Sequence, residues 1–155
     1  MATSAVIQSI TGLLPPLLGT LDRVEWVQRH LYPPLAPRLA EELAPHLDYI
    51  CPMVYPSGYH VGIPGTRNPV ANPYRVVYES VRLTRQRAAP ANVRIRPWLQ
   101  DFRDYAFDKR YFRAGEIRAQ IQGTQKAGGT GWMLWNPKND YTGSALAPQR
   151  SVAAR

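Results

Sequence analysis

Disulfide pairs, long apolar runs and an export signal are all missing from this sequence. It has a single cysteine, Cys51, so no intrachain disulfide can form, and cysteine usage leaves the redox compartment open. No run approaches the roughly 18 apolar residues that a membrane span needs. The first residues have no basic segment, and Pro15 and Pro16 interrupt their apolar run, which argues against a secretory signal. Cys51 lies in an apolar run, and we expect it to be a buried small hydrophobe rather than a reactive thiol.

Motifs for several common chemistries are also absent. No glycine-rich phosphate loop follows an apolar run, since "GGTGW" precedes one and lacks the lysine. No Gly-x-Ser-x-Gly turn occurs, which removes the usual serine hydrolase elbow. His60 has no cysteine or well-spaced second histidine to form a metal site. We therefore expect no metal and no cofactor.

Acidic residues are fewer than basic ones, 11 against 19, which gives a net charge of +8. Most of the excess lies in residues 75–118, which hold eleven Lys and Arg against five Asp and Glu. A basic balance raises the prospect of a polyanion as partner, so a basic interaction domain stays open as an alternative. Sixteen of the basic residues are arginines scattered along expected helices rather than clustered, and we expect no nucleic-acid partner.

Three segments of different character divide the chain. Residues 1–37 form an irregular, proline-rich leader, and residues 147–155 form a frayed tail. Between them, residues 38–146 alternate apolar runs with amphipathic stretches. The runs are "YICPMVY", "NVRIRPWLQDF" and "GWMLW", and helices are expected at about residues 73–87 and 116–128. This alternation predicts βαβ units with parallel strands, which is an α/β fold. The first run has no polar face and is expected to be buried on both sides.

Polar and aromatic side chains follow the expected strands where each strand ends. Right-handed crossovers place the carboxyl ends of parallel strands at one edge, where α/β folds bind ligands. The residues expected there are Tyr55, Tyr59, His60, Trp98, Gln100, Asp101, Trp135 and Asn136. Aromatic faces can cover the apolar side of a sugar ring, while amides and carboxylates bind its hydroxyls. The sequence therefore predicts a carbohydrate-binding cup in which the aromatic residues stack on sugar rings.

Asp101 is the candidate catalytic residue of this cup. It ends an apolar strand, where an acid is costly unless it is bonded or used. Structural alternatives stay open for the other residues, because each tryptophan taken singly is more often part of a core. One of Trp132 and Trp135 is expected to point away from the edge.

Five blocks of sequence also carry a resemblance. They are "DYICPMVYPSGY", "NPVANPYRVVYES", "IRPWLQDF", "EIRAQI" and "GWMLWNPKNDYT". In order and spacing they resemble the C-terminal part of a bacterial family of putative glycosyl hydrolase domains, long classed as a domain of unknown function. The resemblance implies a partial (β/α)8 TIM barrel with about three C-terminal βα units. It also implies hydrolysis of O-glycosidic bonds in a polysaccharide, and intact relatives that are secreted or associated with the cell envelope.

The departures from that family matter for activity. A complete TIM barrel takes about 250 residues and eight strands, and the acid-bearing strand ends of the family's first part have no counterpart in this chain. Glycosidases generally use two carboxyl groups, for which Asp101 is the main candidate, with Asp104 or Asp140 as weaker seconds. The chain is therefore expected to be a truncated fragment with little or no catalysis. A non-catalytic carbohydrate-binding domain is the other alternative, and open sheet edges predict self-association.

Overall fold

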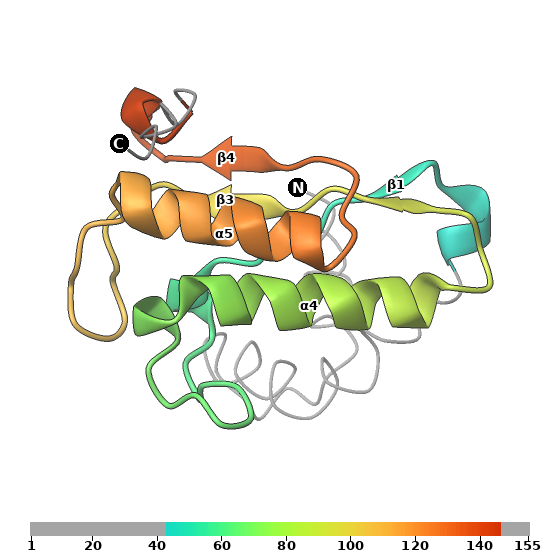
Figure 1. Cartoon of the computed structure of the whole chain (residues 1–155), viewed down its shortest axis with the longest axis horizontal. Helices are drawn as coiled ribbons and strands as arrows, with labels where there is room; N and C mark the ends of the chain where they lie inside the picture. The colour runs from blue at the N-terminus through green and yellow to red at the C-terminus, as the bar shows by residue number, and fades with distance from the viewer. Residues whose placement is uncertain (1–42, 147–155) are drawn as a thin grey trace, which may run out of the picture. The chain divides into compact units, whose positions relative to one another are not determined.

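The computed structural model describes residues 43–146 (Figure 1). The chain divides into two compact units, Met1–Leu43 and Ala44–Arg155, and nearly all the described residues belong to the second. The expected leader and tail, residues 1–37 and 147–155, lie outside the described residues.

Helices and parallel strands alternate along the second unit, as the sequence predicts. The helices are α4 (Pro73–Ala88) and α5 (Ala114–Lys126), and the strands are β1 (Tyr49–Ile50), β2 (Arg94–Ile95), β3 (Trp98–Gln100) and β4 (Met133–Trp135). Short 3₁₀ helices lie at Ala44–His46, Pro56–Gly58, Pro69–Ala71 and Gly143–Ala145. Strand β1 pairs in parallel with β2, and β3 pairs in parallel with β4. The prediction of an α/β fold with parallel strands is therefore confirmed.

Prolines divide the apolar runs into these short strands. Pro97 separates β2 from β3, and Pro52 follows the end of β1. A proline has no backbone N–H to donate to a neighbouring strand, so regular pairing stops there. The run continues nonetheless, because a parallel bridge joins Met53 to Trp98 and the Trp98 N–H donates to the Pro52 carbonyl oxygen at 2.9 Å. The chain thus forms three parallel runs, with the run that contains β2 and β3 between the other two.

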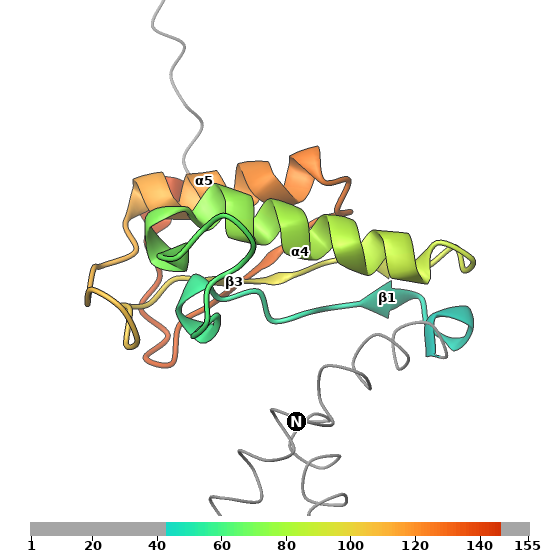
Figure 2. The same ribbon diagram turned by 90° about the horizontal axis from the view of Figure 1, so that it is seen from below.

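Both helices cover the same face of these runs (Figure 2). Ile95 and Leu99 point toward the helices and belong to one buried cluster with Val77 and Val81 of α4. Trp132 packs against this cluster, in agreement with the expectation that one of the two tryptophans near β4 points away from the edge. The helices themselves lie very close, since a Cβ added at Gly123 would stand 2.6 Å from the Tyr74 carbonyl oxygen.

The opposite face of the strands is open, and one expectation from the sequence is wrong here. Residues alternate between the two faces of a strand, so Cys51 and Met53 point away from the helices. Both are exposed, Met53 to 59%. The first run is therefore buried on one side only, and Cys51 is not a buried hydrophobe.

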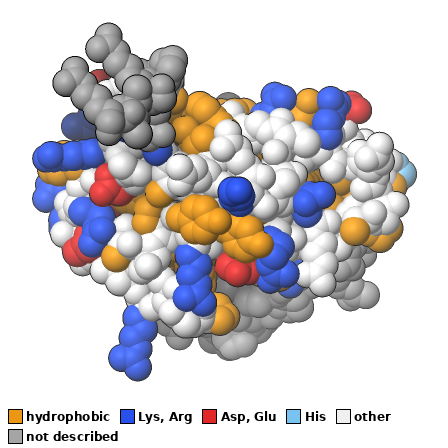
Figure 3. Space-filling view, in the orientation of Figure 1, with side chains coloured by type: hydrophobic (Ala, Val, Ile, Leu, Met, Phe, Trp, Pro, Cys, Tyr) orange, Lys and Arg blue, Asp and Glu red, His pale blue; other side chains and the backbone are white. Residues whose placement is uncertain are grey.

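Two further features of the described region are simple to state. Within residues 43–146, no helix combines the length and the apolar character that crossing a membrane requires. On the face seen in Figure 3, Lys and Arg side chains are spread among apolar and neutral ones rather than gathered into one patch.

Candidate functional site

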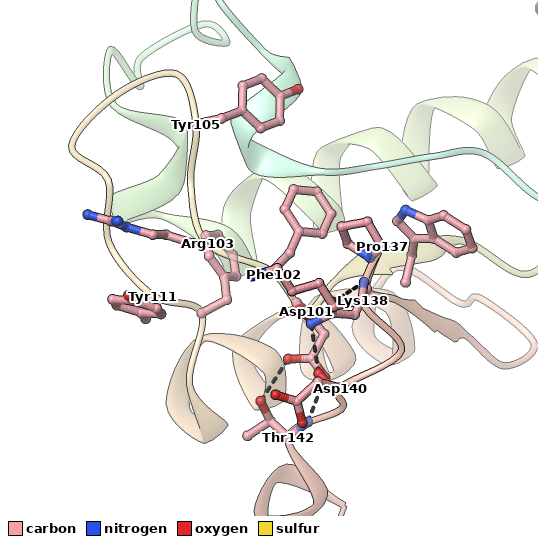
Figure 4. Close-up of a pocket in the computed structure, with 12 residues that line it drawn as sticks. Asp101, Phe102, Arg103, Tyr105, Tyr111, Pro137, Lys138, Asp140 and Thr142 are labelled. Atoms are coloured by element: carbon pink, nitrogen blue, oxygen red, sulfur yellow. Dashed lines mark hydrogen bonds between the residues drawn. The ribbon is translucent and has the colours of Figure 1, made fainter.

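A pocket of about 590 Å³ lies where β3 and β4 end (Figure 4). Two segments line it, namely the loop that follows β3 and the turn that follows β4. Since β3 and β4 are parallel neighbours, their carboxyl ends bring these two segments together. The pocket therefore lies at the edge where the sequence analysis expects a site.

Asp101 joins the two segments and is almost fully buried, with 2% of its surface exposed. Its Oδ2 accepts a hydrogen bond from the Thr142 backbone N–H at 2.8 Å, and its Oδ1 accepts one from Thr142 Oγ1 at 2.7 Å. The Asp101 backbone N–H donates to the Trp135 carbonyl oxygen at 3.0 Å. Both carboxylate oxygens are thus held in place by protein donors at the wall of the pocket.

Asn136 shapes the turn after β4. Its Nδ2 donates to the backbone carbonyl oxygens of Asp101 and Asp140, the latter at 2.7 Å, while its Oδ1 accepts from the Lys138 N–H at 2.9 Å. The amide predicted to bind sugar hydroxyls therefore lines the pocket but is largely engaged with the backbone. What the turn presents instead is the exposed side chains of Lys138 and Asp140.

Aromatic rings form the other wall. Trp135 is 43% exposed, and Tyr105 and Tyr111 of the loop after β3 are 52% and 59% exposed. Phe102 stacks on Tyr105 with ring centroids 6.3 Å apart and planes 9° from parallel. Arg103 lies over Tyr111 with its Cζ 5.0 Å from the ring centroid. The pocket thus offers several accessible ring faces beside a buried carboxylate.

Two predicted residues border the pocket without lining it. The Tyr55 ring meets Phe102 edge to face, with centroids 5.4 Å apart. Burial, followed by the nearby Tyr141 hydroxyl, raises the pKa of Tyr55 to about 12. The His60 ring is exposed and lies 6.2 Å from that of Tyr105. Each ring thus lies next to a residue that lines the pocket, Phe102 or Tyr105.

Three other predicted residues are engaged in packing. The Gln100 side chain is fully buried, accepts from the Ser57 backbone N–H at 3.0 Å and donates to Ser57 Oγ at 2.7 Å. The Tyr59 hydroxyl pairs with Ser80 Oγ on α4 at 2.6 Å. Trp98 meets Trp135 edge to face on the open side of the sheet, with centroids 6.1 Å apart. None of the three is among the residues that line the pocket.

Asp104 holds the loop that carries Tyr105 and Tyr111. Its Oδ1 accepts from Ser57 Oγ and the Ala106 N–H, and its Oδ2 accepts from three further backbone N–H groups, those of residues 107, 108 and 109, all within 3.0 Å. Burial raises the pKa of this carboxyl, but the hydrogen bonds outweigh burial and lower the pKa to about 2. Asp104 is therefore a structural carboxylate that keeps the pocket loop closed.

Several lining residues escaped the sequence analysis. They come mainly from "RDYAFDKRYFR", which is expected only to be a loop, and include Phe102, Arg103, Tyr105, Tyr111 and Phe112. The density of aromatic residues in that loop is the feature that could have indicated them. Within residues 43–146, no group of three or more His, Cys, Asp or Glu side chains stands close enough to hold a metal ion.

Residues 37–141 match the family described as "Putative glycosyl hydrolase domain". The chain belongs to this family. The resemblance of the five sequence blocks to this family is thereby confirmed.

No curated protein matches the sequence. The crystal structure of bee venom hyaluronidase is similar over 73% of this chain and 36% of that chain, with 14% identity and a TM-score of 0.42. This member of the putative glycosyl hydrolase domain family thus spans about a third of that structure.

Proposed function

We propose that this domain binds a segment of polysaccharide in the pocket, as the C-terminal sector of a glycoside hydrolase barrel that cleaves O-glycosidic bonds. The observation that carries the proposal is the combination of exposed rings with a fixed carboxylate at the carboxyl ends of parallel strands. Trp135, Tyr105 and Tyr111 offer faces to the apolar side of sugar rings, and Asp101 and Asp140 offer acceptors to hydroxyls.

The chemistry of the carboxyl groups limits what the chain can do alone. Glycoside hydrolysis generally needs one protonated carboxyl for the leaving oxygen and one carboxylate at the anomeric carbon. Asp101 accepts hydrogen bonds on both oxygens, which suits a carboxylate that orients sugar hydroxyls or stabilises positive charge. Asp140, the second carboxyl at the pocket, lies on an exposed turn. We therefore expect sugar binding by this chain without turnover, and turnover only where a second acid is supplied.

Binding of polyanions is the weaker alternative. It would require basic side chains gathered on one surface, whereas those on the face seen in Figure 3 are dispersed. At the pocket, the positive charges of Arg103 and Lys138 stand beside the negative charges of Asp101 and Asp140. The site thus favours a polar, largely neutral ligand.

Isothermal titration calorimetry with a panel of bacterial and plant oligosaccharides measures their binding and tests the proposal. Trp135→Ala should weaken binding about tenfold, because a lost aromatic contact is worth about 1–1.5 kcal/mol. Tyr74→Ala is the matched control, since Tyr74 is similarly exposed but lies on α4 and does not line the pocket. Failure of every saccharide to bind, or equal binding by the Trp135 variant, would contradict the proposal. Turnover that disappears with Asp101→Asn would show that the chain is itself an enzyme.

A further inference from the structure

Among residues 43–146, no helix comparable to α4 or α5 covers the face of the three runs that lies away from those two helices (Figure 2). The residues that alternate with the core positions Ile95 and Leu99 belong to this open face. They are Arg94, Arg96, Trp98 and Gln100, together with Tyr49, Cys51, Met53, Met133 and Trp135 of the neighbouring runs. Gln100 is fully buried and bonded to Ser57, so the face is open only up to Trp98. Purely parallel sheets occur almost only with both faces covered, because their strands are apolar on both sides.

The edges of the sheet are also open in the described part of the chain. Strand β1 pairs only with β2, and β4 pairs only with β3. Unpaired strand edges present rows of backbone donors and acceptors to any further strand. Face and edges together form one surface that fits an additional layer of β-structure.

One end of this face carries two arginines, Arg94 and Arg96. The guanidinium carbons of Arg94 and Arg96 lie 4.0 and 4.4 Å from the centroid of the same ring, that of Tyr49. Arg96 also donates to the Tyr49 hydroxyl at 3.2 Å, which fixes its position. Among residues 43–146, the one carboxylate near this pair is that of Asp48, 3.9 Å from Arg94 and 92% exposed. Two cations share one ring with very little compensating negative charge.

We propose that the open face docks a strand-bearing partner polypeptide that supplies a carboxylate to Arg94 and Arg96 and apolar side chains to Met53 and Trp98. Charge complementarity carries the choice of partner, because an acidic group is what the basic end lacks. A second copy of this chain fits less well, since its own open face would bring two more arginines. The proposal goes beyond saccharide binding and does not depend on it.

Cys51 provides a direct measurement, because it lies on the open face and is the single cysteine of the chain. The rate at which N-ethylmaleimide labels Cys51 in the full chain reports whether the face is covered. The probes are β-hairpin peptides closed by a head-to-tail peptide bond, because a disulfide could exchange with the Cys51 thiol. They present valines on one face and carry a single Glu, Gln or Lys. Without any hairpin, we expect Cys51 to be labelled at the same rate at low and high protein concentration. Saturating Glu hairpin should slow labelling, with an affinity about five times that of the Gln hairpin at low salt.

Variants test whether the preference for the Glu hairpin over the Gln hairpin depends on Arg94 and Arg96. In the double variant Arg94→Gln/Arg96→Gln, the Glu and Gln hairpins should bind equally, while Arg82→Gln on α4 should retain the preference. Met53→Asp should weaken the binding of every hairpin. Met53 is exposed enough for the chain to fold with this change. Equal binding of all hairpins to the wild type, or no protection by any of them, would overturn the proposal. Protection of Cys51 that grows with protein concentration would assign the face to a second copy, and protection at every concentration would assign it to another part of the same chain. A loss of saccharide binding leaves these readings unchanged, so the two proposals can fail separately.

Discussion

Replacing Asp104 with Asn should destabilise the protein and loosen the pocket loop. In the wild type, Oδ1 accepts from Ser57 Oγ and the Ala106 N–H, while Oδ2 accepts three further N–H groups. An asparagine has one acceptor oxygen at this position and an NH₂ group in place of the other. If the oxygen accepts the three N–H groups, the NH₂ faces the Ala106 N–H, and this partly buried donor is left without an acceptor. The substitution also removes the negative charge that strengthens all five bonds.

The magnitude follows from the pKa of the same group. The folded protein holds the pKa of Asp104 at about 2, against an ordinary value of 3.8. That difference corresponds to about 2 kcal/mol in favour of the folded state when the group is ionised. The Ala106 N–H left without an acceptor is only partly buried and adds less than about 1 kcal/mol. Asp104→Asn should therefore lower the free energy of unfolding by about 2–3 kcal/mol at neutral pH. Because the folded pKa lies below the unfolded one, this contribution is present above about pH 4 and is lost as pH falls toward 2.

Urea unfolding followed by tryptophan fluorescence, repeated across the acidic range, measures both effects. The difference in unfolding free energy between wild type and Asp104→Asn should be constant near neutrality and should shrink between about pH 4 and pH 2. Asp140→Asn is the control, because its exposed carboxylate should contribute less than about 0.5 kcal/mol. The reasoning is refuted if the Asp104 variant matches the wild type at neutral pH. It is equally refuted if the difference between them persists undiminished at pH 2.

Two further substitutions test the packing and the titration of particular groups. Gly123→Ala should cost about 1–3 kcal/mol, because its Cβ would stand 2.6 Å from the Tyr74 carbonyl oxygen, whereas Gly115→Ala in the same helix meets nothing within 4 Å and should stabilise by about 0.5–1 kcal/mol. Thermal unfolding of the two variants checks the contrast, and equal effects would contradict the close helix approach. Tyr55 has its pKa raised to about 12 from 10.0, so its contribution to stability is present below pH 10 and is lost as pH rises toward 12. Tyr55→Phe should therefore flatten the alkaline decline of the unfolding free energy, and an unchanged slope would contradict the burial of the hydroxyl.

Much of the architecture could be predicted because its determinants are local. Pro73 at the first turn predicts where α4 begins, and the helix starts there. Apolar runs alternating with amphipathic helices predict parallel strands, and the pairing of β3 with β4 is parallel. From that arrangement the meeting of Asp101 with Asn136 follows, since both residues end neighbouring strands.

Which polar residues face the pocket and which are bonded inside the protein could not be predicted in the same way, because this depends on partners far away in the sequence. Gln100 is the last residue of β3 and Asp101 directly follows it. The Gln100 side chain is nevertheless bonded to Ser57, 43 residues earlier, and its backbone to Gln120, 20 residues later. No local pattern distinguishes an amide that is satisfied inside the protein from one that faces a ligand. The role of Asp104 is likewise invisible until the loop folds back and places four backbone N–H groups around its carboxylate.

The first run is expected from its sequence to be buried on both sides, and its exposed apolar side chains bear on what covers the open face. Cys51 and Met53 are apolar although they point away from the core, and Arg94 and Arg96 alternate with helix-facing residues without a buried acid beside them. A strand with one solvated face normally alternates apolar and polar residues. The run with Arg94 and Arg96 does so, whereas the first run, with Cys51 and Met53 on the open face, does not. The composition of the first run fits a strand that is enclosed on both sides. The sequence pattern and the exposed surface thus converge on the same requirement, and the labelling rate of Cys51 measures whether an acidic strand meets it.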